Sequence, residues 1–149
     1  MQASRVLPPV FFLSAILLMV LFHLFLPGSR WPTVAGRSVG TLLLVAGVLL
    51  NIVSARLFAK RGTAIKPFQQ STALVVEGPY RFSRNPMYLG MLLVLIGLGL
   101  LLASTIPLLI VPLFLWLISA RFVVVEERML AERFGTAYVE YCRRVRRWL

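Results

Sequence analysis

Acidic residues are scarce in this chain. Five Asp or Glu residues stand against sixteen Lys or Arg, and charged residues make up only 14% of the 149 positions. Hydrophobic residues make up 59%. A soluble domain of this length needs more polar surface than this to cover its core. The composition therefore excludes an ordinary soluble domain.

Cysteine and histidine are each present once, as Cys142 and His23. A single cysteine excludes an internal disulfide and any multi-cysteine metal site, so we expect no metal. Cys142 lies in a basic C-terminal segment, which favours the reduced cytosolic side. His23 lies late in an apolar run, where we expect a satisfied interior hydrogen bond rather than a functional role.

The net charge of +11 raises the question of nucleic acid. A nucleic-acid-binding protein presents its basic residues on a folded soluble face. Here they flank apolar runs instead, which is typical of helix ends at anionic lipid headgroups. We therefore expect anionic lipids, and no nucleic acid, as partners.

Four apolar runs are close to the roughly 20 residues that a membrane-spanning helix needs. They cover about 7–26, 39–58, 87–103 and 105–125. We predict an all-α integral membrane protein in which residues 1–149 form one domain, with about four transmembrane helices and a C-terminal cytoplasmic or interfacial helix. The last two runs should form a tight hairpin around Ser104, and Pro112 should bend the fourth helix.

Small residues recur on one face of the second and third runs. In the second run they are Gly40 and Gly47, with Asn51 and Ser54 continuing the stripe, and a similar glycine pair recurs in the third run. Small residues let helix backbones approach closely, and the polar pair can hydrogen-bond between helices. We expect this face to point into the bundle.

Basic residues lie mainly in two segments, about 59–86 and 126–149. The positive-inside rule places both segments, and both termini, in the cytoplasm. All the acidic residues are on the same side: Glu77, Glu126, Glu127, Glu132 and Glu140. A transporter usually has polar groups near the bilayer midplane, so this one-sided chemistry argues against transport.

The segment from Thr72 to Gly90 is the first that can support chemistry. Asn85-Pro86 is suited to open the third helix as N-cap and first helical residue. The positive end of that helix, beside Arg81 and Arg84, predicts an anion site at the membrane surface. A capped juxtamembrane helix with basic lipid anchors explains the same residues equally well.

The segment from Val125 to Leu149 is the second. We expect the fourth helix to continue to a bend at Gly135, with Thr136 capping a new helix. That helix has an apolar stripe and should lie on the membrane surface or fold back over the site as a lid. Glu126 and Glu127 stand where the chain leaves the bilayer, and each needs a cationic partner, either an arginine of the preceding loop or a bound cation.

Together these segments place an anion-binding helix start near two carboxylates and several tyrosines. A zwitterionic, cationic ligand with an aromatic part would suit such a site. S-adenosylmethionine fits this description, although the physical features permit that ligand without selecting it.

Two motifs resemble the isoprenylcysteine carboxyl methyltransferase family, which is related to the phospholipid N-methyltransferases. They are Gly78-Pro-Tyr-Arg-Phe-Ser-Arg-Asn-Pro-Met-Tyr-Leu-Gly90 and Glu126-Glu127 followed by Phe134-Gly135, Tyr138 and Tyr141. The likeness covers Thr72 to the end. It implies an S-adenosylmethionine-dependent membrane methyltransferase with its cofactor on the cytosolic side, under the C-terminal segment. A lipophilic acceptor would enter from the bilayer.

The resemblance also implies roles for individual residues. Glu126 would hold the amino group of the cofactor, and Arg84 would orient the cofactor carboxylate or the acceptor. Glu126 or Glu127 could assist the deprotonation of an amine acceptor. The remaining cofactor contacts would come from the backbone and side chains of Leu74, Val75, Tyr80, Asn85, Pro86 and Tyr88.

The sequence departs from the family pattern at two positions. Asn85 replaces the family histidine, and an amide cannot titrate near neutral pH. Phe122, beside Arg121, replaces an arginine that holds the substrate carboxylate, which argues against a prenylcysteine carboxylate as acceptor. The alternatives are a phospholipid amine or small hydrophobic thiol methyltransferase, and a non-enzymatic scaffold with a lipid-binding basic tail.

Overall fold

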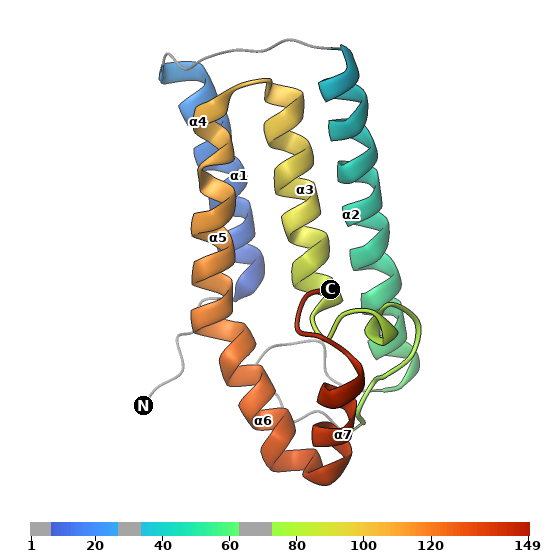
Figure 1. Cartoon of the computed structure of the whole chain (residues 1–149). Helices are drawn as coiled ribbons and strands as arrows, with labels where there is room; N and C mark the ends of the chain where they lie inside the picture. The colour runs from blue at the N-terminus through green and yellow to red at the C-terminus, as the bar shows by residue number, and fades with distance from the viewer. Residues whose placement is uncertain (1–6, 27–33, 63–72) are drawn as a thin grey trace.

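The computed structural model describes residues 7–26, 34–62 and 73–149, which fold into an antiparallel bundle of helices (Figure 1). The first three long helices are α1 (Pro8–Phe25), α2 (Val34–Lys60) and α3 (Pro86–Leu102). The last run comprises α4 (Thr105–Leu108), α5 (Ile110–Ile118), the π-helical turn η2 (Ser119–Val123) and α6 (Val124–Phe134). The short 3₁₀ helix η1 (Gly78–Arg81) precedes α3, and α7 (Thr136–Arg144) follows α6. The predicted all-α fold is confirmed.

The helix α3 lies at the centre of the bundle, between α2 on one side and α1 with α5 on the other (Figure 1). Glycines set its distance from α2. A Cβ added to Gly47 would lie 2.5 Å from the Gly90 carbonyl oxygen, and one added to Gly97 would lie 2.6 Å from that of Gly40. The two backbones are therefore in direct contact, and the small-residue stripes pack within one chain.

The polar residues of that interface do not link the helices as predicted. The Asn51 side chain donates to the Gly47 carbonyl oxygen in its own helix, at 3.0 Å. The Ser54 hydroxyl and His23 Nδ1 are buried without a hydrogen-bond partner in the part of the chain that the structure describes. The interhelical bonds expected of Asn51 and Ser54 are thus not formed there. Nor does His23 Nδ1 make the interior hydrogen bond that we expected of the His23 side chain.

The first and third helices agree with their predicted ranges to within one residue. The second is longer than the predicted 39–58, because Val34 to Ser38 continue the helix beyond the apolar run. Their side chains are largely exposed, so this extension follows from continued backbone hydrogen bonding rather than from burial of apolar side chains. The hairpin around Ser104 is confirmed: Ala103 takes a left-handed conformation (φ 49°) and Ser104 is buried at the start of α4.

The fourth run is one long apolar helix, Thr105–Phe134, with an interruption close to Pro112, where we predicted a bend. The break falls at Leu109, one turn before Pro112, whose missing N–H leaves no donor for the Leu108 carbonyl. The π-helical turn η2 then widens the helix and buries Phe122 and Val123. Turns of this kind occur often at functional sites.

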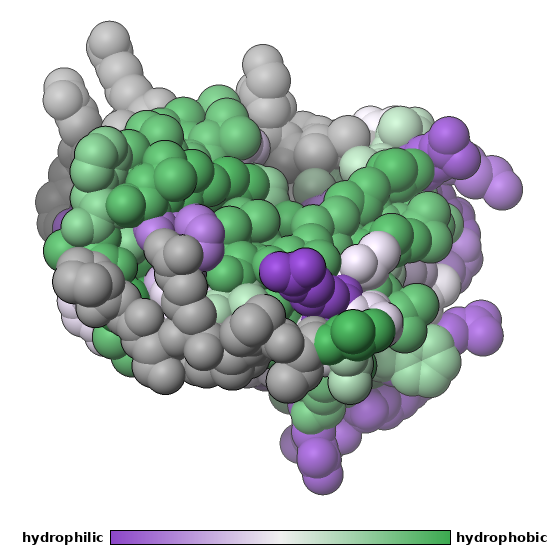
Figure 2. Space-filling view, turned by 90° about the horizontal axis from the view of Figure 1, so that it is seen from above, coloured by the Kyte–Doolittle hydropathy of each residue, from purple (hydrophilic) through white to green (hydrophobic). Residues whose placement is uncertain are grey.

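Three helices are long and apolar enough to cross a membrane: Pro8–Phe25, Val34–Lys60 and Thr105–Phe134. The helix α3 is also apolar, with 17 residues. Many leucines of α1 and α2 face outward, and Figure 2 shows hydrophobic residues over most of the bundle seen along its axis. Such a surface suits lipid rather than water, so the chain is an integral membrane protein.

Candidate functional site

The start of α3 and the helix α6 meet at one end of the bundle. Pro86 is the first residue of α3, and Tyr88 lies in its first turn. The Tyr88 hydroxyl donates a hydrogen bond of 2.6 Å to Oε1 of Glu126, in the first turn of α6. Tyr88 is only 7% exposed. The two sequence motifs therefore come together in space.

Glu126 accepts a hydrogen bond from Tyr88 and has no cationic partner in the part of the chain that the structure describes. Among the described residues, none of the ion pairs includes it. The arginine of the preceding loop, Arg84, pairs with Glu127 instead. A buried carboxylate without a cation is costly. Of the two partners that we predicted for Glu126, Arg84 of the preceding loop is thus not in contact with it.

Glu127 lies between two arginines. Arg84 Nη2 is 3.4 Å from Oε1 of Glu127. Arg147 approaches the same carboxylate with Nε, 3.1 Å from Oε2, and with Nη2, 2.6 Å from Oε2. A planar guanidinium and a carboxylate match in this way. The hydrogen bond to Glu127 raises the pKa of Arg147, so this guanidinium stays protonated.

The loop before α3 holds the C-terminal residues. The Arg84 amide donates to the Arg146 carbonyl at 3.0 Å. The Ser83 hydroxyl and the Asn85 side-chain amide both donate to the Arg147 carbonyl, at 3.3 and 3.2 Å. Asn85 is the N-cap of α3 as predicted, but its side chain does not cap the helix. The Ser83 hydroxyl oxygen accepts a hydrogen bond from the backbone N–H of Asn85, at 3.1 Å.

The helix α7 folds back over the loop before α3 (Figure 1). Gly135 makes the bend, with a φ of 50° that favours glycine. Gly135 is also the N-cap of α7, so our prediction of Thr136 as the cap is wrong: Thr136 is already helical. The apolar stripe is confirmed, because a buried cluster forms around Tyr138, Tyr141 and Val145.

Tyrosines line the contact between α7 and the loop. The Tyr141 hydroxyl donates to the Tyr80 carbonyl at 2.7 Å, and the Tyr80 ring lies 5.4 Å from that of Phe58. Leu74 packs against the Tyr138–Tyr141 cluster, and Val75 is buried. Burial raises the pKa of Tyr141 to about 12 and that of Tyr80 well above its usual range, so both phenols are neutral.

Two buried polar groups in this region lack an oxygen partner among residues 7–26, 34–62 and 73–149. They are Arg84 Nε and the Tyr138 hydroxyl, which has the Cys142 thiol beside it. Arg84 Nη1 does contact the Cys142 thiol at 2.6 Å. Native structures rarely leave buried donors unpaired, and such groups often mark a binding site.

All the residues that we selected from the sequence lie at this end of the bundle, where the contacts above join the loop before α3 to α6 and α7. Arg81 is exposed and does not take part. Sequence reasoning missed Ser83 and Arg147. A buried serine inside a basic loop has no distinguishing pattern, and Arg147 is one of four tail arginines. Lys66 and Thr72 lie outside the described residues, which also contain no cluster suited to a metal.

The family model described as phospholipid methyltransferase matches residues 36–137. The chain belongs to this family. The match includes α2, α3 and α6 with the Tyr88–Glu126 contact, so the candidate site is built on family segments. The C-terminal residues that contact Glu127 lie beyond it.

The proteins that are similar to this chain include a methyltransferase and a metal-resistance protein. Protein-S-isoprenylcysteine O-methyltransferase B of Arabidopsis thaliana is 36% identical over 48% of this chain and 36% of its own length. The cobalt-zinc-cadmium resistance protein CzcN of Cupriavidus metallidurans is 32% identical over 84% of this chain and 56% of its own. The chain thus spans only about a third to a half of these relatives.

A solved structure has the same fold. It is described as the eukaryotic intramembrane Ras methyltransferase ICMT, with a TM-score of 0.68 over 92% of this chain and 50% of that one. The sequences are 20% identical. At this identity the likeness shows the arrangement of the helices alone.

Proposed function

We propose that this protein transfers a methyl group from S-adenosylmethionine to a lipophilic acceptor in the membrane. The observation on which this depends is Glu126: a carboxylate held by Tyr88 at 2.6 Å, with no cation among the described residues, where α3 meets α6. The methyl donor has an ammonium group that would supply the missing charge. Membership of the phospholipid methyltransferase family supports the same activity.

Different residues of the site would bind different parts of the methyl donor. Glu126 would bind its ammonium, and Arg84 would orient its carboxylate or the acceptor. These two groups stand on α6 and on the loop before α3, which the Tyr88–Glu126 and Arg84–Glu127 contacts hold together. The walls for the nucleoside would come from Leu74, Val75, Tyr80, Asn85, Pro86 and Tyr88.

The chemistry supplied by the donor is an electrophilic methyl group, whose bond to sulfur breaks as its bond to an oxygen, nitrogen or sulfur of the acceptor forms. The protein would align the two atoms in a site that excludes water. A carboxylate acceptor needs no base. A protonated amine would first lose its proton, and Glu126 or Glu127 could accept it.

The position of Phe122 favours an acceptor without a carboxylate. Phe122 is 2% exposed and packs edge-on against Phe11, with ring centroids 5.5 Å apart. Arg121, its neighbour, is exposed. No cation therefore faces the bundle interior at this place in η2, so a phospholipid amine or a small hydrophobic thiol is the second candidate beside an isoprenylcysteine-like carboxylate.

We further propose that the site faces the cytoplasm. The first and last described residues lie at the same end of the bundle as the site (Figure 1). Arg128, Arg133, Arg143 and Arg144 are exposed at this end. The positive-inside rule places such an end in the cytoplasm, where exposed arginines would contact anionic lipids.

Binding of labelled S-adenosylmethionine to the detergent-purified protein tests the proposal. We expect saturable binding that S-adenosylhomocysteine displaces. Absence of binding would favour the scaffold alternative. A panel of carboxylate, amine and thiol acceptors, assayed for methyl incorporation in lipid vesicles, would then identify the substrate class.

A further inference from the structure

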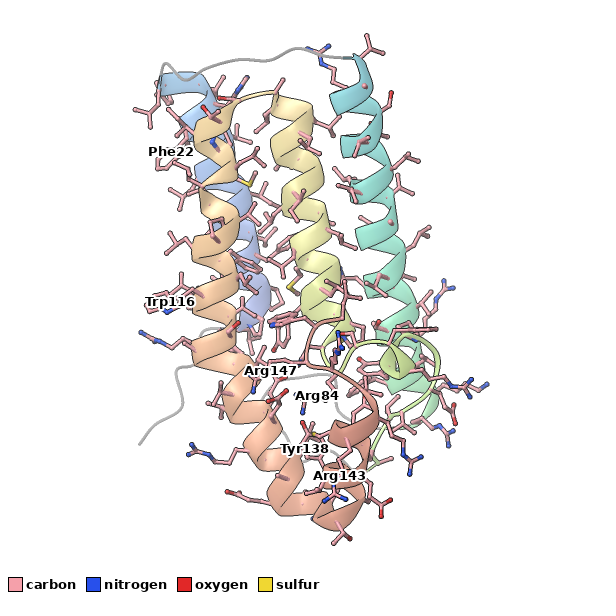
Figure 3. The ribbon with its side chains drawn as sticks, in the orientation of Figure 1. Phe22, Arg84, Trp116, Tyr138, Arg143 and Arg147 are labelled. Atoms are coloured by element: carbon pink, nitrogen blue, oxygen red, sulfur yellow. The ribbon has the colours of Figure 1, made fainter. Side chains whose placement is uncertain are left out.

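A second group of polar side chains lies beside Glu126, between α6, α7 and the loop before α3. It consists of Arg84, Glu127, Tyr138, Cys142 and Arg147. Figure 3 places the labelled Arg84, Tyr138 and Arg147 together in this space, whereas Arg143 lies farther out on α7. The ion pairs of Glu127 join α6 to the loop and to the C-terminal residues.

The charges of this group do not balance. Two guanidinium groups share one carboxylate, since Arg84 and Arg147 both pair with Glu127. The side chain of Arg84 is 16% exposed and that of Glu127 13%, whereas that of Arg147 is 43% exposed, so the group opens to solvent on the side of Arg147. A net positive charge in a partly buried place is stabilised by an anion.

The hydrogen bonds do not balance either. The Tyr138 residue is 4% exposed, yet apart from the Cys142 thiol its hydroxyl has no hydrogen-bond partner within the described part of the chain, and Arg84 Nε has none there. Burial and the nearby Glu127 raise the pKa of Tyr138 above its usual range. The phenol therefore keeps its hydrogen, and two buried donors lack an oxygen acceptor among the described residues.

One positive charge in excess and two free donors match a single carboxylate, which has two oxygens and one negative charge. We propose that Arg84, Tyr138 and Arg147 form a carboxylate subsite for the amino-acid part of the methyl donor. This inference rests on the proposed function and adds two residues to it. Glu126 would bind the ammonium of the same group, because its neighbour in α6, Glu127, already contacts both arginines.

The test compares two ligands on the purified full chain. One is S-adenosylmethionine, and the other is its decarboxylated form, which keeps the sulfonium and the amine. We expect Tyr138→Phe to weaken binding of S-adenosylmethionine at least about tenfold, as expected for a hydrogen bond to a charged group. Binding of the decarboxylated form should not change. Arg147→Gln should show the same selectivity.

Two control variants separate the subsite from general effects. Tyr141→Phe removes a hydroxyl bonded to the Tyr80 carbonyl, so it should change the affinities of both ligands by the same factor. Arg143→Gln removes an exposed charge and should change neither. Equal losses for both ligands in Tyr138→Phe and Arg147→Gln would overturn the subsite while leaving the proposed function intact. Failure of the wild-type protein to bind either ligand would overturn both.

Discussion

The Tyr88 hydroxyl and the Glu126 carboxylate are joined by a hydrogen bond of 2.6 Å between two residues 38 positions apart. The bond links the first turn of α3 to the first turn of α6. The bond also explains how the Glu126 carboxylate can be held at the end of a membrane helix with no cationic side chain paired to it among the described residues, because the buried Tyr88 phenol is a neutral donor.

The Tyr88–Glu126 bond should appear as a coupling energy. Tyr88→Phe and Glu126→Ala, which each remove one partner of the bond, are each expected to lower the unfolding temperature in detergent. Contacting residues typically show interaction energies of about 0.5–3 kcal/mol, so the double variant should lose less than the sum of the two. If the loss of stability in the double variant equals the sum of the two single losses, the bond does not form in the membrane protein.

The contact between α2 and α3 should not tolerate a methyl group at Gly47. A Cβ there would meet the Gly90 carbonyl at 2.5 Å, which only a separation of the helices can relieve. We expect Gly47→Ala to destabilise the protein by roughly 1–3 kcal/mol, a typical cost of overpacking. Ala46→Val, on the exposed side of the same turn, is the control and should have little effect. Similar thermal unfolding of both variants would contradict the packing.

Glu127 should control the order of the C-terminal residues. Glu127→Gln removes the ion pairs to Arg84 and Arg147, so hydrogen exchange of residues 145–149 should become faster. Glu140→Gln is the matched control, because its ion pair with Arg144 is exposed and within one helix. Exposed pairs of this kind contribute little. Unchanged exchange in Glu127→Gln would show that the loop carbonyl contacts alone hold the tail.

Tyr141 should make the protein sensitive to alkali. Its pKa is raised from 10.0 to about 12, mainly by burial. A raised pKa means that the folded state prefers the neutral phenol, so its contribution is fully present below pH 10 and is lost as the pH rises towards 12. Ultraviolet titration should show a smaller absorbance rise near pH 10 than in denaturant. Tyr141→Phe should remove one late-titrating phenol.

Sequence patterns predicted the bundle because apolar runs and glycine spacing are local features. The runs at 7–26 and 87–103 correspond closely to α1 and α3, and the Gly40–Gly47 face packs as predicted. The π-helical turn at Ser119–Val123 was missed, since it does not change the hydrophobic pattern, whereas Pro112 did indicate the irregularity at Leu109.

The candidate site was predicted less completely than the fold. The motifs identified Tyr88 and Glu126, but not that they bond to each other. Among the described residues, Glu127 pairs with two arginines and Glu126 with none. This difference depends on how α7 folds back at Gly135. That is a tertiary relationship, and the identical arginines of the tail contain no local information about it.

The central claim is that Glu126 binds the cation of S-adenosylmethionine, and calorimetry on Glu126→Gln tests it most directly. The variant keeps an acceptor for Tyr88 but loses the charge, so we expect affinity to fall by more than about a hundredfold, as for a broken buried ion pair. Glu132→Gln, on the exposed face of α6, should bind as the wild type does. Unchanged affinity in a folded Glu126→Gln protein would remove Glu126 from the site and contradict the account.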